Sequence, residues 1–137
     1  MKIKSKLSNI LLIEDNVNDV LLIKIALEKA AIHAYLSTIT NGEEAINYIR
    51  KLKSENEFPS LILLDINLPK VTGLEVLKSI KLNKITSEIP TVVFTSSGLK
   101  SDMEYSYFNK ANLYIHKPNN INSFKETMIY IKDHFCF

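Results

Sequence analysis

Several residue types are scarce in this sequence of 137 residues, and each shortage excludes a class of protein. The one cysteine, Cys136, cannot form a disulfide within the chain and fits a reducing compartment, so we expect a cytoplasmic protein. Arg50 is the only arginine among 17 basic residues, and the formal net charge is only +2, which does not favour binding to nucleic acid or to a membrane surface. The longest apolar runs have four or five residues, so we expect no membrane span and no signal peptide.

What the chain does contain is an alternation of short apolar runs and longer segments with helical spacing. The runs predict strands at 10–13, 35–39, 61–64, 91–94 and 113–115, of which the second is the weakest. The segments between and after them predict helices at 18–31, 43–53, 74–82, 102–109 and 123–134. This pattern predicts an α/β protein with a flavodoxin-like doubly wound sheet of five parallel strands, (βα)5, in the order 2-1-3-4-5. We expect one domain over 1–137, with its core at about 8–134 and no output domain.

Polar side chains follow four of the five predicted strands at the point where each strand ends. Glu14 and Asp15 follow the first strand, Asp65 the third, Thr95 the fourth and Lys117 the fifth. Each of them alone has a local explanation as a helix cap or a turn residue. Because ligands bind outside the carboxyl ends of the strands in this architecture, the set as a whole predicts one functional site at that edge of the sheet.

The chemistry of this set indicates phosphoryl transfer to a carboxylate. Three clustered carboxylates repel one another unless a cation lies between them, and Mg²⁺ prefers carboxylates together with water and phosphate oxygens. A lysine and a hydroxyl nearby would neutralise and hold the transferring oxygens. Asp65 would then be the nucleophile and would become an acyl phosphate.

Four segments at these strand ends resemble the signature blocks of a known family. "LLIEDN", "LLDINLPKVTG", "PTVVFTSS" and "LYIHKP" are similar, in order and spacing, to the receiver domain of two-component response regulators. The likeness covers nearly the whole chain and extends to single-domain receivers of the chemotaxis type and those paired with phytochrome-type kinases. The resemblance implies that a sensor histidine kinase or a phosphotransfer protein donates a phosphoryl group to Asp65.

The resemblance also implies a metal site. Asp15 would bind Mg²⁺ directly, Glu14 would act through water, and Asp65 would contribute its carboxylate. Asn67, two residues beyond the acceptor, would contribute its backbone carbonyl.

The remaining residues that the resemblance singles out form a switch. Thr95 would turn inward to bond the phosphoryl group, Tyr114 would fill the space that this leaves, and Lys117 would bind the added charge. The rearranged surface would then change its contacts with an unknown downstream protein. Such a domain is not an enzyme for a separate substrate, since it catalyses only its own phosphorylation and dephosphorylation.

Two other functions remain open on the residues alone. Haloacid-dehalogenase-type phosphatases also place an aspartate at a strand end, but in a D-x-D pattern, and here Asn67 occupies the place of the second acid. The other alternative is a flavodoxin-like binding module without phosphoryl chemistry. Neither of the two glycine-rich phosphate-binding loop patterns is present, which argues against nucleotide binding.

Two surfaces are candidates for protein contacts. Leu21 and Ile25 lie opposite the expected core-facing stripe of the first helix, and the resemblance implies that they dock onto a sensor kinase, although exposed apolar pairs often have no function. The fourth helix, fifth strand and fifth helix are rich in aromatic residues, which suits a homodimer or partner face there, and a purely core role for these residues is the alternative. The aromatic residues concerned are Tyr105, Tyr107, Phe108, Tyr114 and Tyr130.

Overall fold

Strands and helices alternate along the chain in the computed structural model, which describes residues 8–135 and 137. The strands are β1 (Ser8–Ile13), β2 (Ala34–Ile39), β3 (Leu61–Leu64), β4 (Thr91–Thr95) and β5 (Leu113–His116). The helices are α1 (Val17–Lys29), α2 (Gly42–Lys51), the 3-10 helix η1 (Glu55–Glu57), α3 (Gly73–Leu82), α4 (Lys100–Phe108) and α5 (Ile121–Phe135). All strand pairs are parallel and the order is β2-β1-β3-β4-β5, so the predicted fold is confirmed.

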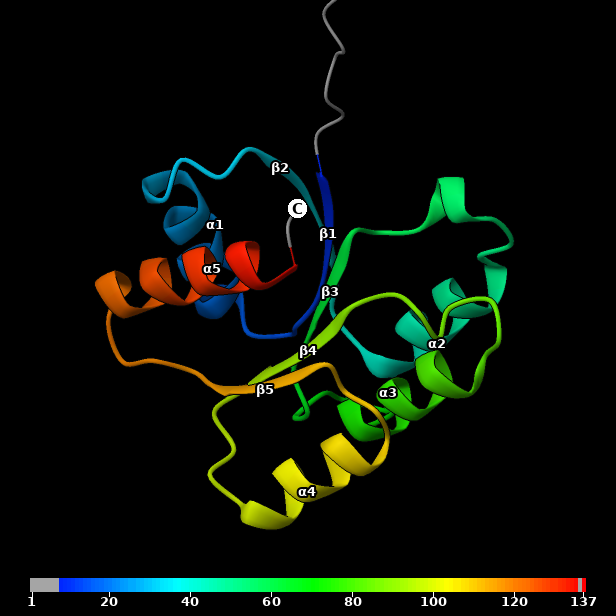
Figure 1. The fold of residues 1–137 in the computed structure, drawn as a ribbon. Helices are drawn as coiled ribbons and strands as arrows, with labels where there is room; N and C mark the ends of the chain where they lie inside the picture. The colour runs from blue at the N-terminus through cyan, green and yellow to red at the C-terminus, as the bar shows by residue number, and fades with distance from the viewer. Residues whose placement is uncertain (1–7, 136) are drawn as a thin grey trace, which may run out of the picture.

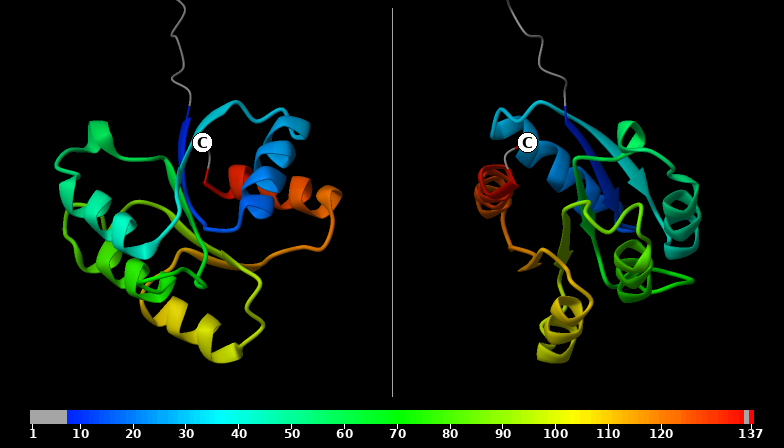
Figure 2. Two further views of the ribbon diagram at one scale, coloured as in Figure 1. Left: turned by 180° about the vertical axis from the view of Figure 1, so that it is seen from behind. Right: turned by 45° about the vertical axis from the view of Figure 1, so that its right-hand side comes forward.

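The sheet has a layer of helices on each face. In Figures 1 and 2, α1 and α5 lie side by side on one face, while α2 and α3 lie on the other. Along β1, Leu11 and Ile13 belong to the apolar cluster under α2 and α3, and Ile10 and Leu12 belong to the cluster under α1 and α5. Both faces of the central strands are therefore buried, which explains why these strands are continuous apolar runs and do not alternate with polar residues.

The element boundaries differ from the sequence prediction by no more than two residues at any end. The helix predicted over 18–31 ends at Lys29, because Ala31 adopts the left-handed conformation with φ of 54° and turns the chain toward β2. The buried residues of α1 are Ile23, Ala26 and Leu27. The sheet and helices span Ser8–Phe135, close to the expected core, and the absence of an output domain stays a prediction. No helix within residues 8–135 has the length and apolar character needed to cross a membrane.

Gly73 lets the start of α3 approach the end of β3 closely. A Cβ at Gly73 would lie 2.0 Å from the backbone oxygen of Asp65, a distance that no side chain tolerates. The N–H of Gly73 instead donates to the oxygen of Ile66 at 2.8 Å, which brings the start of α3 against the end of β3. The loop that carries Asp65 and Asn67 therefore runs between the end of β3 and the start of α3, which are in contact with each other at Gly73.

Candidate functional site

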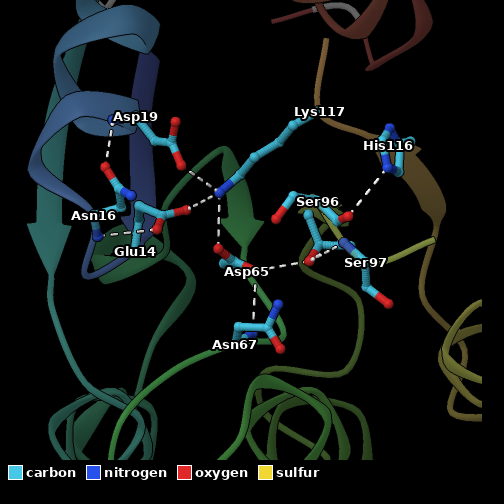
Figure 3. Close-up of polar contacts among 10 residues, drawn as sticks. Glu14, Asn16, Asp19, Asp65, Asn67, Ser96, Ser97, His116 and Lys117 are labelled. Atoms are coloured by element: carbon cyan, nitrogen blue, oxygen red, sulfur yellow. Dashed lines mark hydrogen bonds and ion pairs between the residues drawn. The ribbon is translucent and has the colours of Figure 1, made fainter. Parts of the chain in front are cut away.

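Lys117 lies at the centre of a cluster of carboxylates at the carboxyl edge of the sheet (Figure 3). Its Nζ atom is 2.7 Å from Oε2 of Glu14, 2.8 Å from Oδ2 of Asp19 and 2.8 Å from Oδ2 of Asp65. The side chain of Lys117 is only 6% exposed. Each of the three ammonium protons therefore has a carboxylate acceptor, and water has little access to the cation.

The backbone ladder of the sheet continues just past the strand ends and holds these residues in place. The N–H of Asp65 donates to the oxygen of Ile13 at 3.0 Å, so β3 stays paired with β1 up to the acid. The N–H of Lys117 donates to the oxygen of Thr95 at 2.8 Å, so β5 stays paired with β4 up to the lysine. The site is thus carried by rigid elements, and its geometry follows from the register of the strands.

Asp65 has a partner for each of its oxygens. Oδ1 accepts a hydrogen bond from Oγ1 of Thr95 at 2.8 Å and another from the N–H of Asn67 at 3.1 Å, while Oδ2 faces Lys117. Burial raises the pKa of a carboxyl, but the hydrogen bond from Lys117, the positive charge of that lysine and the hydrogen bond from Thr95 act against it, and the pKa of Asp65 lies below its usual value. Asp65 is therefore ionised at neutral pH although it is only 5% exposed.

Glu14 is shifted in the other direction. Burial is the largest cause, and the nearby charge of Asp65 adds to it against the opposing effect of Lys117, so the pKa of Glu14 rises to about 7. Oε1 of Glu14 accepts a hydrogen bond from the N–H of Asn16 at 3.1 Å. Near neutral pH this carboxyl can therefore gain or lose a proton, while that of Asp65 keeps its charge.

Lys117 stays charged in this setting. Burial would lower the pKa of its ammonium, but the hydrogen bonds to Asp19, Asp65 and Glu14 raise it above its usual value. One positive charge nevertheless faces three carboxylates, and the exposed Asp15 follows directly after Glu14. The site therefore has an excess of negative charge even with Glu14 protonated.

This donor set fits a hard divalent cation by charge and by atom type. Carboxylate and backbone oxygens are the ligands that Mg²⁺ prefers. Asp15 makes no side-chain hydrogen bond or ion pair with other residues of the described chain, so its oxygens are available to a ligand. The described residues hold no group of three acidic, histidine or cysteine side chains that is already arranged to bind a metal ion, and three of the carboxylates at this edge face Lys117.

The structure brings together four of the residues that the sequence predicted for this site and adds one that it did not. Glu14, Asp65, Thr95 and Lys117 are mutually linked, as expected. Asp19 was missed because an acid in the first turn of a helix is ordinarily a favourable partner of the helix dipole. The signal that could have identified it is the phase of α1, which turns this position toward the strand ends.

Tyr114 contacts the loop after β4. Its hydroxyl donates to the backbone oxygen of Ser97 at 2.9 Å, and its N–H donates to the hydroxyl of Tyr107 on α4 at 3.0 Å. Tyr114 is half-buried, and burial raises the pKa of its phenol. Since Ser97 lies two residues after Thr95, the predicted switch pair is connected through this loop.

The two candidate contact surfaces differ in how well they are exposed. Leu21 is 54% exposed, but Ile25 is half-buried, because it lies about 40° around α1 from Leu21, toward the buried face. The aromatic residues of α4 and α5 reach solvent more fully, and Phe108 is 81% exposed. Exposed aromatic side chains on these elements also include Tyr105, Tyr107 and Tyr130.

Comparison with known proteins gives consistent results. Residues 10–129 match the model of the response regulator receiver domain family. The chain is 35% identical over 127 residues to the probable methanogenesis regulatory protein FilR2 of Methanothrix harundinacea (strain 6Ac), covering 92% of this chain and 82% of that protein. It is 38% identical over 117 residues to the response regulator Rcp1 of Synechocystis sp. (strain ATCC 27184 / PCC 6803 / Kazusa), covering 82% and 78%.

Solved structures extend the similarity to three dimensions. The crystal structure of the phosphorylated cyanobacterial phytochrome response regulator RcpA is similar with a TM-score of 0.85 and 34% identity, covering 96% of this chain and 95% of that one. The crystal structure of the Mn²⁺-bound form of response regulator Rcp1 is similar with a TM-score of 0.80 and 35% identity, covering 92% of each chain.

Proposed function

Because this chain belongs to the response regulator receiver domain family, we propose that Asp65 is the residue that accepts a phosphoryl group in two-component signalling. One observation carries the proposal: Asp65 is buried and ionised, with Nζ of Lys117 and Oγ1 of Thr95 each 2.8 Å from one of its oxygens. A carboxylate held in this way is a nucleophile with a cation and a hydroxyl already beside it. Family membership also favours this function over a phosphatase or a binding module without phosphoryl chemistry.

The reaction that we propose is an in-line transfer. An oxygen of Asp65 attacks the phosphorus of a phosphohistidine on a sensor kinase or a phosphotransfer protein. The new P–O bond forms as the P–N bond breaks, the electron pair of that bond stays on the imidazole nitrogen, and the imidazole takes up a proton from solvent as it leaves. Lys117 and Thr95 then hydrogen-bond to the phosphoryl oxygens, where they stabilise charge that was absent before the transfer.

Mg²⁺ would neutralise part of the charge on the transferring oxygens. The residues that would hold it are Asp15, Asp65 and the backbone carbonyl of Asn67, with Glu14 acting through water. The excess negative charge of the site and the available carboxylate of Asp15 support this assignment. The crystal structure of Rcp1 with bound Mn²⁺ shows that a similar receiver accepts a divalent cation.

The output that we propose is a population shift. The added charge on Asp65 favours the conformations in which Thr95 and Lys117 bond the phosphoryl group, and the loop of Ser97 transmits this to Tyr114 and α4. Partners would be a kinase or phosphotransfer protein docking near Leu21 and Ile25, an unknown downstream protein, and a second copy of the chain at the α4, β5 and α5 face. The domain would act in the cytoplasm and would catalyse only its own phosphorylation and dephosphorylation.

The test is incubation with acetyl phosphate and Mg²⁺, followed by intact-mass measurement. The unaltered chain should gain one phosphoryl group and Asp65→Asn should gain none, while Glu126→Gln, which changes an exposed acid on α5, should behave like the unaltered chain. A phosphoryl group on Asp65→Asn would place the acceptor elsewhere. Steady hydrolysis of phosphate esters would favour the phosphatase.

A further inference from the structure

A second cluster of polar side chains lies at the opposite end of the sheet from Asp65. There the last turns of α3 and α4 border a pocket of about 220 Å³. We call it the Lys81 pocket, and the residues that line it are Lys78, Lys81, Leu82, Phe108, Asn109 and Lys110. It contains three lysines and no acidic residue.

Lys81 is a half-buried cation whose hydrogen-bond partners are all neutral. Its Nζ atom donates to the backbone oxygens of Ser87 at 3.1 Å and Ile89 at 2.9 Å, and to Oδ1 of Asn112 at 2.9 Å. Burial lowers the pKa of this lysine to about 8, and the charge of the exposed Glu88 opposes that shift only in part. The structure therefore holds a half-buried ammonium group without a carboxylate in contact with it.

The other two lysines of the pocket also lack a counter-ion. Lys78 and Lys110 are exposed and form no ion pair with any residue in 8–135. Surface lysines of this kind are ordinarily solvated and have no function. Here they lie beside the half-buried charge of Lys81, so their positive potentials add at one concave place.

Large apolar side chains border the same place. Leu82 is 72% exposed and Phe108 is 81% exposed, and within residues 8–135 only Val17 among the other large apolar residues has a comparable exposure. One such residue alone would need no explanation. Two of them on either side of a pocket lined by lysines form a surface that is both apolar and cationic.

We propose that the Lys81 pocket is a docking site for an acidic segment of a partner protein that also carries an apolar anchor residue. Carboxylates of the segment would meet Lys78 and Lys110 and would supply the negative charge that Lys81 lacks. A leucine or phenylalanine side chain would cover Leu82 and Phe108, where burial removes apolar surface from water. A concave site of this size fits a side chain and its flanking acids better than the extended backbone of a nucleic acid.

This docking site is separate from the phosphoryl site. Lys81 lies near the amino end of β4 and Asp65 at the carboxyl end of β3, so the two are at opposite ends of the sheet. The proposal therefore stands whether or not Asp65 accepts a phosphoryl group. An effect of phosphorylation on docking would travel through α4, which carries Phe108 at its end and contacts Tyr114 through Tyr107.

The test uses a displayed library of short random peptides selected on the unaltered chain, with counter-selection on the double variant Lys78→Gln/Lys110→Gln. The peptides that remain should be acidic and should carry leucine or an aromatic residue. By fluorescence anisotropy, their affinity should fall roughly tenfold in the double variant and in Phe108→Ser. The matched control Lys24→Gln/Lys51→Gln removes two exposed lysines elsewhere and should change the affinity by less than about twofold.

Three results would overturn the proposal. The first is a selection that leaves no peptides after counter-selection, or peptides without net negative charge. The second is a dimer of the unaltered chain in sedimentation that Phe108→Ser dissociates, because a second copy would then cover the pocket. The third is pocket-dependent binding to phosphatidylglycerol vesicles, which would assign the surface to lipid.

Discussion

Lys117 and Lys81 are both withdrawn from water and each donates three hydrogen bonds, yet their pKa values shift in opposite directions. All three acceptors of Lys117 are carboxylates, and the pKa of its ammonium is raised. All three acceptors of Lys81 are neutral oxygens, and its pKa falls to about 8. Burial acts against the charge in both cases, so the acceptors decide the sign of the shift.

The difference indicates what each end of the sheet can do. Around Lys117 negative charge exceeds positive charge and the balance can change, because Glu14 titrates near neutral pH and Asp65 is the phosphoryl acceptor that we propose. Around Lys81 the partners are backbone carbonyls and an amide, which neither titrate nor accept a phosphoryl group. The region around Lys117 is suited to switching. The region around Lys81 joins α3 to the segments before β4 and β5, and its positive charge is not neutralised by a carboxylate in contact with it.

The first comparison replaces each of the two lysines by methionine in turn, and the larger loss of stability is expected for Lys117→Met. Lys117→Met leaves three carboxylates without their cation, and breaking a buried pair in this way costs about 3 kcal/mol or more in the free energy of unfolding. Denaturant titration at pH 8 measures this loss, and Mg²⁺ should restore part of it by binding the freed carboxylates. A loss under about 1 kcal/mol would show that the carboxylates do not depend on Lys117.

The same variant tests signalling. Lys117→Met should still accept a phosphoryl group from acetyl phosphate. At the same degree of phosphorylation, however, its affinity for a partner should not change on phosphorylation as that of the unaltered chain does. Lys117→Arg should not restore the response fully, because a planar guanidinium cannot replace a compact ammonium among three acids. A normal response from Lys117→Met would mean that Thr95 and Tyr114 switch without this lysine.

The second effect is a dependence of stability on pH that arises from Glu14. Its pKa is raised from 4.5 to about 7 on folding, so the folded state binds the proton more tightly than the unfolded state. That contribution is complete below about pH 4.5 and is lost as the pH rises through 7, a fall on the order of 2–3 kcal/mol in the free energy of unfolding. Glu14→Gln should flatten the decline between pH 5 and pH 8, and an equally steep decline in that variant would assign it to another group.

Lys81→Met should cost less than Lys117→Met. It leaves two carbonyls and one amide oxygen with fewer partners, which is worth about 1 kcal/mol, and it removes a charge that burial disfavours. The pKa of Lys81 is lowered from 10.5 to about 8, so its charged form destabilises the folded state, and this penalty disappears as the pH rises from 8 toward 10.5. The unaltered chain should therefore gain stability relative to Lys81→Met over that range. If Lys81→Met and Lys117→Met lost the same free energy of unfolding at pH 7, the proposed difference between the two lysines would be wrong.

The smallest effect is expected for Asp19→Asn. Asp19 is the most exposed of the three partners of Lys117, with 23% of its side chain accessible, so its loss should cost about 0.5–1 kcal/mol. It should also leave Lys117 freer to bond a phosphoryl group, and the acyl phosphate of Asp65 should show a changed lifetime by intact-mass measurement. Glu28→Gln, an exposed acid on the same helix, is the control, and identical lifetimes for both variants would exclude a role for Asp19 in the site.

The sequence by itself determined the fold and the centre of the site. Apolar runs that do not alternate require strands buried on both faces, and a parallel sheet brings their carboxyl ends to one edge. Asp65 and Thr95 directly follow such a run, and Lys117 follows one after a single residue, so their convergence could be predicted without any knowledge of contacts. Local patterns were sufficient because each residue is fixed by the end of its own strand.

Only the tertiary structure decided which charges pair. Glu14 and Lys117 are 103 positions apart, and Asp19 joins them because of the rotational phase of α1 against the sheet. Ile25 is half-buried for the same kind of reason. The partners of Lys81 come from the segments before β4 and β5, which no periodicity connects to α3. Periodicity specifies the face of an element on which a residue lies, but the packing of elements distant in sequence sets the dielectric environment and the partners that give a buried lysine its pKa.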